Sequence, residues 1–393
     1  MTYPTTATTL LGNIEANLRA IRERVGERLV LAAVKANAYG HGAVEVAQMI
    51  ERTGAADWLG VATVDEGITL RQAGVTLPIL KLSPTRDDDD VARAVAAGLT
   101  LTVVDEASVA QLARAAASST ERSPNYRELP KLRELSIVRG ALGVPVHLKV
   151  DTGMRRVGVE PDQAVALAAR IEAEPGLHLQ GVFSHLPISD SPEGAEFTRA
   201  QTETFGAVAS AIEAEVGRPV LKHLANSGAV LGHPDTWFDL VRPGIMIYGS
   251  LPDPRAEPTV PLLPGMRLTT RLSFVKPVAA GETVSYGRTW TAPSNTWIGT
   301  MPVGYGDGYS RLLSNRGRVL IDGGFHPIAG RVCMDQTMID LGPDTSARVG
   351  DEVVLIGRSG DQEITVAEIA ELMGTIPYEV TCLFTDRVAR AYA

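Results

Sequence analysis

Eight short apolar runs, which alternate with segments of helical periodicity, are the feature of this chain that most restricts its fold. The runs are rich in branched apolar residues, and the segments between them are rich in Ala, Glu, Arg and Leu. The runs cover residues 29–34, 58–63, 79–83, 101–105, 144–151, 179–185, 221–226 and 240–248. An alternation of strands and helices predicts a parallel sheet. A doubly wound open sheet has the same alternation, but eight repeats over this length favour a (β/α)8 barrel.

The pattern changes after residue 250. Five prolines punctuate residues 252–264, and β-strand patterns with turns follow at 268–278, 297–303, 318–321, 336–340 and 352–356. One amphipathic helix is expected over 366–373, with Thr365 as its N-cap. We therefore predict an α/β fold in which a TIM-type barrel over residues 8–250 is followed by a mostly β domain over residues 251–393.

Two polar stretches lie outside this pattern. Residues 119–143 form a long, charge-mixed excursion between the fourth and fifth strands, whose function cannot be read from the sequence. The run Asp87 to Asp90 is best explained as a solvated loop or a helix start, because adjacent aspartates cannot all point at one metal ion.

Composition narrows the classes of function. A net charge of -9 argues against a surface for nucleic acid or for an anionic membrane. The start of the chain does not resemble a secretory signal, and no apolar run reaches membrane-spanning length, so we expect a cytoplasmic protein. Cys333 and Cys382 lack the spacing of metal ligands and are too few for a disulfide framework, so no metal site is expected.

Lys35 is placed where the first apolar run gives way to a glycine-containing turn. An arbitrary lysine at a strand end usually extends to solvent. Here small neighbouring residues leave room for a ligand, and partial desolvation would lower the pKa of the amine toward that of a usable nucleophile or base. Lys35 is therefore a candidate for a lysine that forms a Schiff base.

Other polar residues follow the apolar runs, at the strand ends that share one rim in a parallel barrel. They are Asp65, Ser83, Asp105, Lys149, Asp151, His185, Asn226, Ser227 and Arg242. Lys, His, Asn, Ser and Arg side chains on one rim predict a site for an anionic ligand beside a reactive amine.

Seven segments of the chain, in the same order, resemble the signatures of the alanine racemase family, whose members use pyridoxal 5'-phosphate (PLP). The similarity spans nearly the whole chain. The segments are Val34 to Gly42, Lys149 to Met154, His223 to Ser227, Arg242 to Ile245, Ser285 to Gly287, Val303 to Gly308, and Cys333 to Gln336. The resemblance implies a PLP-binding barrel with a C-terminal β domain, acting on alanine as a homodimer and supplying D-alanine for peptidoglycan.

The resemblance also implies which residues bind the cofactor. Phosphate favours hydroxyls, glycine N–H groups and a helix N-terminus. The implied cofactor-binding residues are Lys35, Tyr39, His185, Asn226, Ser227, Arg242, Gly244, Ile245 and Tyr378.

Arg242 narrows the reaction type, because the resemblance places it against the pyridine nitrogen of the cofactor. Many PLP enzymes use a carboxylate there, which keeps that nitrogen protonated and makes the ring a strong electron sink. An arginine does not readily give up its proton, so the nitrogen would stay unprotonated. Return of a proton to Cα then competes well with transamination, which favours a racemase.

Racemisation needs a proton-transfer group on each face of Cα. The resemblance assigns these roles to Lys35 and to Tyr286, which comes from the partner subunit and is linked through His185 to Arg242. It further assigns the substrate carboxylate to Arg156 and to the backbone N–H of Met334. Lys149 is implied to be carbamylated and to orient Arg156; Tyr305 and Asp335 resemble site-wall residues without an assigned role.

Three alternatives remain open at the level of sequence. A racemase of broader specificity would act on Ser, Lys or Arg. A PLP-dependent decarboxylase of the same architecture would be expected to hold the pyridine nitrogen with an acidic residue, where this chain has Arg242. A non-catalytic PLP-binding protein would resemble a lone barrel, without the β domain that carries Tyr286.

Overall fold

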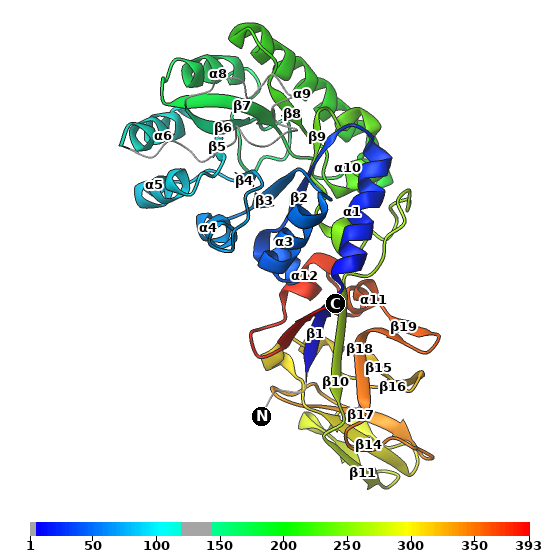
Figure 1. Cartoon of the computed structure of the whole chain (residues 1–393). Coiled ribbons are helices and arrows are strands. Elements are labelled where there is room, and N and C mark those ends of the chain that lie inside the picture. Colours follow the sequence, from blue (N-terminus) through cyan, green and yellow to red (C-terminus); the bar gives the residue numbers. More distant parts are fainter. Residues whose placement is uncertain (1–4, 119–142) are drawn as a thin grey trace.

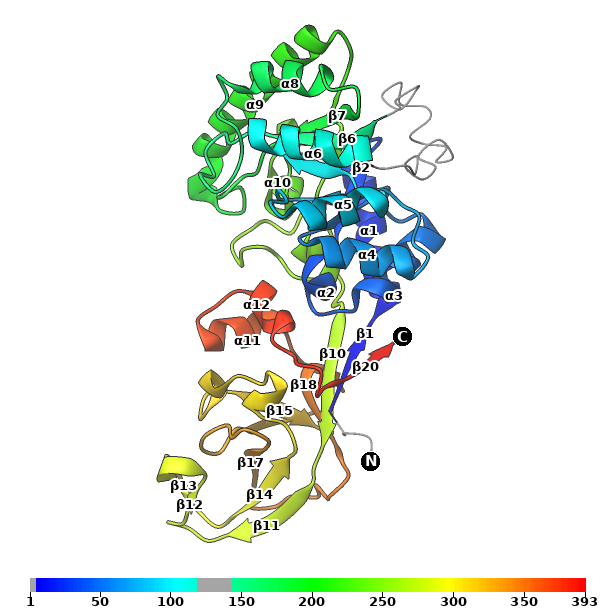
Figure 2. The same ribbon diagram turned by 90° about the vertical axis from the view of Figure 1, so that its left-hand side faces the viewer.

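The computed structural model describes residues 5–118 and 143–393. The chain forms an elongated molecule in which a barrel with its helices sits above a smaller, strand-rich domain (Figure 1). A view from the side shows the same two parts joined through β1 and β10 (Figure 2). The excursion at residues 119–143 lies, except for Gly143, outside the described residues.

The upper part contains the eight parallel strands that the sequence predicts. They are β2 (Leu29–Ala33), β3 (Trp58–Val61), β4 (Ile79–Lys81), β5 (Leu101–Val103), β6 (Val144–Lys149), β7 (Leu177–Phe183), β8 (Leu221–His223) and β9 (Leu240–Val241). They form two four-stranded sheets, in the orders β4-β3-β2-β9 and β5-β6-β7-β8. A bridge between Leu80 and Thr100 joins the sheets on one side, and a backbone bond from Arg242 to Ala225 (2.9 Å) joins them on the other, so the barrel is closed.

Helices surround the barrel. They are α1 (Leu11–Val25), the short α2 (Lys35–Tyr39), α3 (Ala43–Thr53), α4 (Val64–Gln72), α5 (Asp88–Ala96), α6 (Glu106–Ser118), α8 (Ala164–Glu172), α9 (Ala195–Val216) and α10 (Ser227–Gly232). Asp87 caps α5 by accepting a hydrogen bond from the backbone N–H of Asp90. The aspartate run is therefore a helix start, where carboxylates interact favourably with the helix dipole.

The eighth apolar run is a strand over only two of its residues. After β9 the chain turns at Arg242 and Pro243, and Ile245–Tyr248 form a 3-10 helix. Proline lacks the N–H that a ladder requires, so the strand ends before it. This break aims the Arg242 side chain and the Gly244 backbone at the rim of the barrel.

The lower part is built from β-sheets. A seven-stranded sheet has the order β16-β15-β18-β10-β1-β20, with β19 paired to β18. Its strands are β1 (Thr6–Thr9), β10 (Met266–Arg271), β15 (Arg318–Ile321), β16 (Gly324–Pro327), β18 (Glu352–Ser359), β19 (Gln362–Ile364) and β20 (Ala389–Tyr392). Because β1 pairs with β10 and β20, residues 6–9 belong to this sheet and not to the barrel.

Two smaller sheets complete the lower part. They contain β11 (Phe274–Val278), β14 (Thr296–Met301) and β17 (Thr337–Gly342), and the pair β12 (Thr283–Val284) and β13 (Trp290–Thr291). The run at 268–278 was expected as one strand and is two, β10 and β11, which belong to different sheets. Helix α11 (Val366–Met373) has the predicted bounds, and the Thr365 side chain caps it by accepting from the N–H of Glu368. Helix α12 (Pro377–Cys382) follows.

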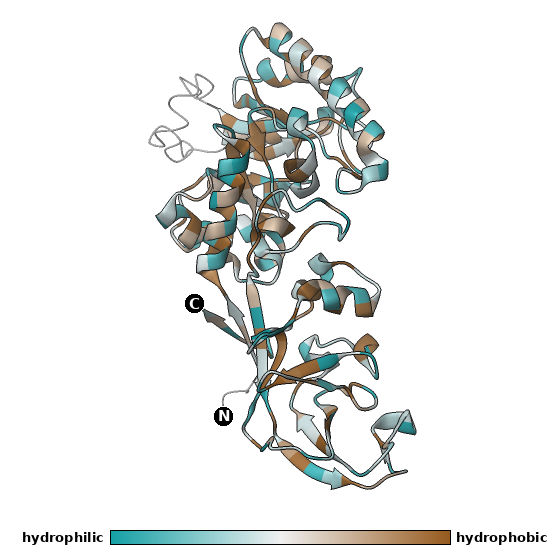
Figure 3. Cartoon of the chain, turned by 90° about the vertical axis from the view of Figure 1, so that its right-hand side faces the viewer, coloured by the Kyte–Doolittle hydropathy of each residue, from teal (hydrophilic) through white to brown (hydrophobic). Residues whose placement is uncertain are grey.

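Hydrophobic residues, brown in Figure 3, gather on the strands, and hydrophilic residues colour much of the helices that surround the barrel. One apolar core fills the barrel and a second one fills the β domain. Within the described parts of the chain, no helix is long and apolar enough to cross a membrane.

Candidate active site

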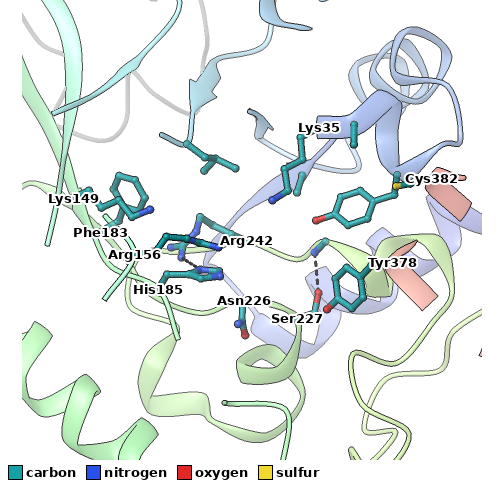
Figure 4. A pocket seen from close by; sticks show the side chains of 15 residues that line it. Lys35, Lys149, Arg156, Phe183, His185, Asn226, Ser227, Arg242, Tyr378 and Cys382 are labelled. Carbon is teal, nitrogen blue, oxygen red and sulfur yellow. Dashed lines mark hydrogen bonds between the residues drawn. The ribbon is translucent and has the colours of Figure 1, made fainter. Parts of the chain in front are cut away.

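A cavity of about 360 Å³ opens at the rim where the barrel strands end. Figure 4 shows Arg156, His185 and Arg242 at one end, Ser227 and Tyr378 at the other, and Lys35 reaching in between them. The described lining residues are Ala33, Lys35, Ala36, Tyr39, Leu82, Lys149, Arg156, Phe183, His185, Asn226, Ser227, Arg242, Gly244, Tyr378 and Cys382. This lining includes two lysine and two arginine side chains and no carboxylate, so the cavity favours an anionic ligand.

Lys35 begins a turn of left-handed backbone. Ala36, Asn37, Ala38 and Tyr39 all have φ between 51° and 54°. Each such residue costs roughly 1–2 kcal/mol relative to a right-handed turn, because Cβ approaches the following carbonyl oxygen. A run of four non-glycine residues in this conformation persists only where surrounding contacts fix it, which is typical of functional sites.

Several contacts hold this turn. The Glu66 carboxylate accepts from the N–H of Ala36 at 2.7 Å and, through its other oxygen, from the N–H groups of Ala62 and Thr63. The Tyr248 hydroxyl donates to the carbonyl of Ala33 at 2.8 Å. These bonds connect the turn to α4, and Ala33 at the end of β2 to the 3-10 helix Ile245–Tyr248, so the position of Lys35 depends on elements far apart in the sequence.

Both lysines of the cavity have lowered pKa values. Burial, followed by the charge of Arg156, lowers the pKa of the Lys35 ammonium. Burial, followed by the charge of Arg242, lowers the pKa of Lys149 to about 8. A lowered pKa makes the neutral amine more available, as a nucleophilic or carbon-dioxide-reactive lysine requires.

The Arg242 guanidinium is buried and is held by neutral acceptors. It donates to the carbonyls of Ser184 (2.7 Å) and Leu224 (3.0 Å) and to the Nδ1 atoms of His223 (3.0 Å) and His185 (3.4 Å). Burial lowers its pKa to about 9. That value is above neutrality, so the side chain remains a cation near pH 7.

A chain of buried histidines continues behind Arg242. His223 and His147 share a hydrogen bond of 2.8 Å between Nε2 and Nδ1. Burial lowers the pKa of His147 to about 3, and burial with the charge of Arg242 lowers the pKa of His223 well below its ordinary value. Both are neutral near pH 7. Because Arg242 donates to Nδ1 of His223, the His223 proton is placed on Nε2 and points to His147.

The opposite end of the cavity presents hydroxyl and N–H groups. The Gly244 N–H donates to the Ser227 hydroxyl at 2.9 Å, and Asn226 caps α10 by accepting from the N–H of Ala229. A Cβ at Gly244 would lie 2.6 Å from the Tyr39 hydroxyl oxygen, so a larger residue there would have to displace the Tyr39 side chain. The rings of Tyr39 and Tyr378 lie 5.9 Å apart. Such a cradle suits a phosphate.

The side chains of the adjacent residues Arg155 and Arg156 point in different directions. Arg156 lines the cavity, whereas Arg155 points away and forms an ion pair with Glu160 at 2.7 Å. Arg155 has φ of 54°, and its N–H donates to the Asp151 carboxylate, as does the N–H of Gly153. The turn that Asp151 stabilises thus directs the second arginine, and not the first, into the cavity.

Three of the residues expected to bind the cofactor or substrate or to react do not line this cavity, and neither do Tyr305 and Asp335. Ile245 is buried at the start of its 3-10 helix. Tyr286 and Met334 belong to the β domain, and they are 73% and 53% exposed. Both side chains therefore project from the β domain and not into the cavity of their own chain.

The cavity also includes residues that the sequence analysis did not single out as site residues. Phe183 lies beneath two cations, with Lys149 Nζ at 5.2 Å and Arg242 Cζ at 5.5 Å from its ring centre. Cys382 follows Tyr378 by one helical turn on α12, so the i,i+4 spacing was the signal for it. Ala33, Ala36 and Leu82 complete the wall, and small or apolar residues at strand ends carry no such signal.

The fold and the cavity together define a (β/α)8 barrel protein with a cationic, lysine-containing site at its rim and a second, β-rich domain. Family models for the N-terminal and C-terminal domains of alanine racemase match residues 10–252 and 265–392. The chain belongs to the alanine racemase family.

Individual relatives agree with this assignment. The chain is 49% identical over 380 residues to an alanine racemase of Cutibacterium acnes, covering 97% of this chain and 95% of that protein. A solved alanine racemase of Clostridium difficile 630 has a TM-score of 0.89 at 33% identity, over 100% of this chain and 96% of that one. The alanine racemase of Bacillus anthracis, solved with bound L-Ala-P, has a TM-score of 0.86 at 34% identity, over 100% and 96%.

Proposed function

We propose that this chain interconverts L-alanine and D-alanine with PLP held in the rim cavity. The observation that carries the proposal is the meeting, in one cavity, of Lys35 on its left-handed turn, the cation Arg242, and the hydroxyl and N–H groups around Ser227 and Gly244. Membership of the alanine racemase family supports the choice of substrate.

The cavity fits the cofactor in charge and in donor type. Its cations suit an anion, and the Gly244 cradle, which has no room for a Cβ, suits phosphate oxygens. Lys35 would hold the aldehyde carbon, and Arg242 would face the pyridine nitrogen. Tyr39, Asn226, Ser227, Gly244, Ile245 and Tyr378 would surround the phosphate. When bound, PLP supplies an electron-withdrawing group that makes the Cα proton of an amino acid removable.

The environment of Arg242 supports a racemase over a decarboxylase. Its hydrogen-bond acceptors are carbonyls and histidines that their lowered pKa values keep neutral, and no carboxylate is among the acceptors found in the described residues. The guanidinium therefore presents its charge to the cavity and disfavours protonation of a facing nitrogen. His185 accepts from Arg242 on Nδ1, so its Nε2 carries a proton that can be donated toward a second base.

The substrate carboxylate is assigned to the Arg156 guanidinium and the backbone N–H of Met334. Lys149 is proposed to be carbamylated, which its lowered pKa favours because the neutral amine reacts with carbon dioxide. The carbamate is an anion and would orient Arg156. Lys35 Nζ would exchange a proton with Cα on one face, and the Tyr286 hydroxyl would do so on the other.

Tyr286 and Met334 do not line the cavity of their own chain and are exposed on the β domain, so the roles proposed for them require a homodimer in which each subunit completes the cavity of the other. The boundary between the barrel and the β domain near residue 250, and a cytoplasmic location, remain predictions. A racemase of broader specificity is the remaining alternative, because the described residues do not determine the size or charge of the substrate side chain that the site accepts.

The first experiment identifies the reaction and the lysine. Purified protein reconstituted with PLP is given L-alanine, and D-alanine, carbon dioxide and keto acid are measured. We expect D-alanine as the main product, and L-serine, L-lysine and L-arginine as poor substrates. Borohydride should fix the cofactor to Lys35, and Lys35→Ala should abolish that labelling. Carbon dioxide as the main product, or labelling of another lysine, would contradict the proposal.

The second experiment tests the shared site. Tyr286→Phe should retain the cofactor and lose most racemisation. Mixed with Lys35→Ala, it forms heterodimers with one intact site and one doubly altered site. Random exchange of subunits should restore activity to about a quarter of the wild-type sites, as twofold symmetry requires. Absence of recovery despite demonstrated exchange would exclude a role for Tyr286 in the partner's site.

A further inference from the structure

Arg387 lies between two aspartates of the β domain. Its Nε is 3.1 Å from Oδ1 of Asp307, and its Nη2 donates to Oδ1 of Asp335 at 2.7 Å. The Asp307 side chain is completely buried, whereas the Asp335 side chain is 60% exposed. One guanidinium thus links an anchored carboxylate to a carboxylate on the surface.

The two aspartates belong to the two loops that carry Tyr305 and Met334. The loops are bonded to each other, from the N–H of Tyr305 to the carbonyl of Cys333 (3.0 Å) and from the N–H of Gly306 to the carbonyl of Met334 (2.9 Å). Tyr305 and Met334 are 43% and 53% exposed. These loops therefore form one unit that projects its side chains from the β domain.

Arg387 is fitted closely to this unit. A Cβ at Gly306 would lie 2.5 Å from Nη1 of Arg387, so the guanidinium approaches the backbone where glycine leaves space. The neighbouring Thr385 donates from its hydroxyl to the carbonyl of Gly306 at 3.1 Å and from its N–H to the carbonyl of Asp307 at 3.1 Å. Residues 385–387 thus hold the loops by backbone and side chain together.

An arginine side chain is well suited to linking the buried carboxylate of Asp307 to the exposed carboxylate of Asp335. An exposed ion pair contributes little by itself, because water screens it and two long side chains must be ordered. Here the buried Asp307 fixes the guanidinium in advance, so less freedom is lost when Asp335 binds. The planar guanidinium can also donate hydrogen bonds to two carboxylates at once, which the single ammonium group of a lysine does less well.

We propose that Arg387 is a positioning residue that sets the Met334 backbone N–H and the Tyr305 ring for the active-site cavity of the neighbouring subunit. This inference rests on the homodimer of the proposed function. Because Met334 would bind the substrate carboxylate before and during the reaction alike, loosening it weakens binding more than it slows the chemistry.

The first test compares Arg387→Met and Arg387→Lys with wild type in PLP-loaded enzyme. Arg387→Met should raise KM for L-alanine about tenfold and leave kcat within about twofold, and Arg387→Lys should recover part of the loss. The matched control is Arg358→Met, which removes an exposed ion pair with Glu363 from the same domain and should leave both constants unchanged. A fall in kcat with KM unchanged would overturn the proposal.

Hydrogen exchange provides a readout that does not depend on activity. In Arg387→Met the peptides covering 304–308 and 333–337 should exchange faster, while those from β10 and β18 keep their protection. Faster exchange throughout the β domain would indicate a general structural role and would contradict the proposal. If Arg387→Met fails to fold, Asp335→Asn retains the pair with Asp307 and should give the same pattern with a smaller rise in KM.

Subunit mixing tests whether Arg387 affects the cavity of its own subunit or that of the partner subunit. In a heterodimer of Arg387→Met with Lys35→Ala, the cavity that retains Lys35 faces the loops of the subunit that retains Arg387. Its KM should return to the wild-type value. A KM that stays at the Arg387→Met value would place the effect within its own barrel and refute the inference. If Tyr286→Phe also fails to recover on mixing, the shared site itself is wrong, and the inference falls with it.

Discussion

Glu66 offers a test of whether the left-handed turn determines the position of Lys35. Its Oε1 accepts from the N–H of Ala36, the first residue of the turn, while its Oε2 accepts from the N–H groups of Ala62 and Thr63. Glu66→Ala removes all three bonds. Glu66 does not line the cavity, so an effect on activity must pass through the backbone that carries Lys35 or through the charge of the carboxylate, which opposes the lowering of the Lys35 pKa by burial.

The magnitude follows from these contacts. Glu66 is half-buried, so water partly replaces the three bonds, and the free energy of unfolding should fall by about 1–2 kcal/mol. The four left-handed residues store roughly 4–8 kcal/mol, at 1–2 kcal/mol each, which favours relaxation of the turn once this clamp is gone. A displacement of Lys35 by about 1 Å would lower kcat/KM by about 10²-fold.

Glu51 is a matched control. Its carboxylate also accepts three hydrogen bonds, from the N–H and hydroxyl of Thr76 and the N–H of Leu77, but none of these bonds involves the turn. Glu51→Ala should cost about the same stability in urea denaturation and leave kcat/KM unchanged. Equal losses of activity in Glu66→Ala and Glu51→Ala would refute the reasoning, since a general loss of stability would then suffice.

The glutamine variants sharpen the comparison. Glu51 uses a single oxygen for all three bonds, so Glu51→Gln can keep them and should lie within about 0.5 kcal/mol of wild type. Glu66 uses both oxygens, so Glu66→Gln must turn its NH₂ group toward Ala36 or toward Ala62 and Thr63. Glu66→Gln should therefore lose stability and activity, and wild-type behaviour would contradict the assigned geometry.

Three further predictions concern the cavity. Because burial lowers the pKa of Lys149 to about 8, its charge costs stability below about pH 8 and progressively less toward pH 10.5. In urea denaturation without carbon dioxide, Lys149→Met should thus stabilise the apoprotein more at pH 6.5 than at pH 9.5. Arg242→Glu should slow racemisation by orders of magnitude and raise keto acid formed per turnover; an unchanged ratio would separate Arg242 from the choice of reaction. Ser227→Ala should weaken PLP binding about tenfold in equilibrium titration, since it removes a hydroxyl beside the Gly244 N–H.

Much of the fold followed from local patterns. The eight barrel strands were predicted because a run of branched apolar residues between turns has few other folded solutions. Helix α11 was predicted to the residue, since Thr365 and Glu368 form a local cap that does not depend on the rest of the molecule. The rim position of Lys35, Lys149, His185, Asn226, Ser227 and Arg242 followed from one rule, that the ends of parallel strands face the same way.

The left-handed turn could not have been predicted in this way. Ala36 and Ala38 favour right-handed helix, and no glycine occupies any of the four positions with φ near 53°. The turn is held by Glu66, thirty residues away, and by Tyr248, whose hydroxyl reaches Ala33 from beyond β9. Tertiary contacts thus override local preference at the residue that bears the chemistry. The same limit applies to the pairing of β1 with β20, which joins the two ends of the chain.

Arg242 was identified as a site residue from the sequence, but its electrostatic role depends on hydrogen-bond acceptors that only the fold brings to it. The carbonyls of Ser184 and Leu224 are free to accept from it because β7 and β8 end just before them. His223, at the end of β8, faces the barrel interior, where burial keeps it neutral and able to accept on Nδ1. Neutral acceptors bind the N–H groups of the guanidinium and leave its positive charge in place. A carboxylate would have accepted the same hydrogen bonds and also neutralised the charge. The charge thus stays directed at the cavity, which is the property that a facing, unprotonated ring nitrogen requires.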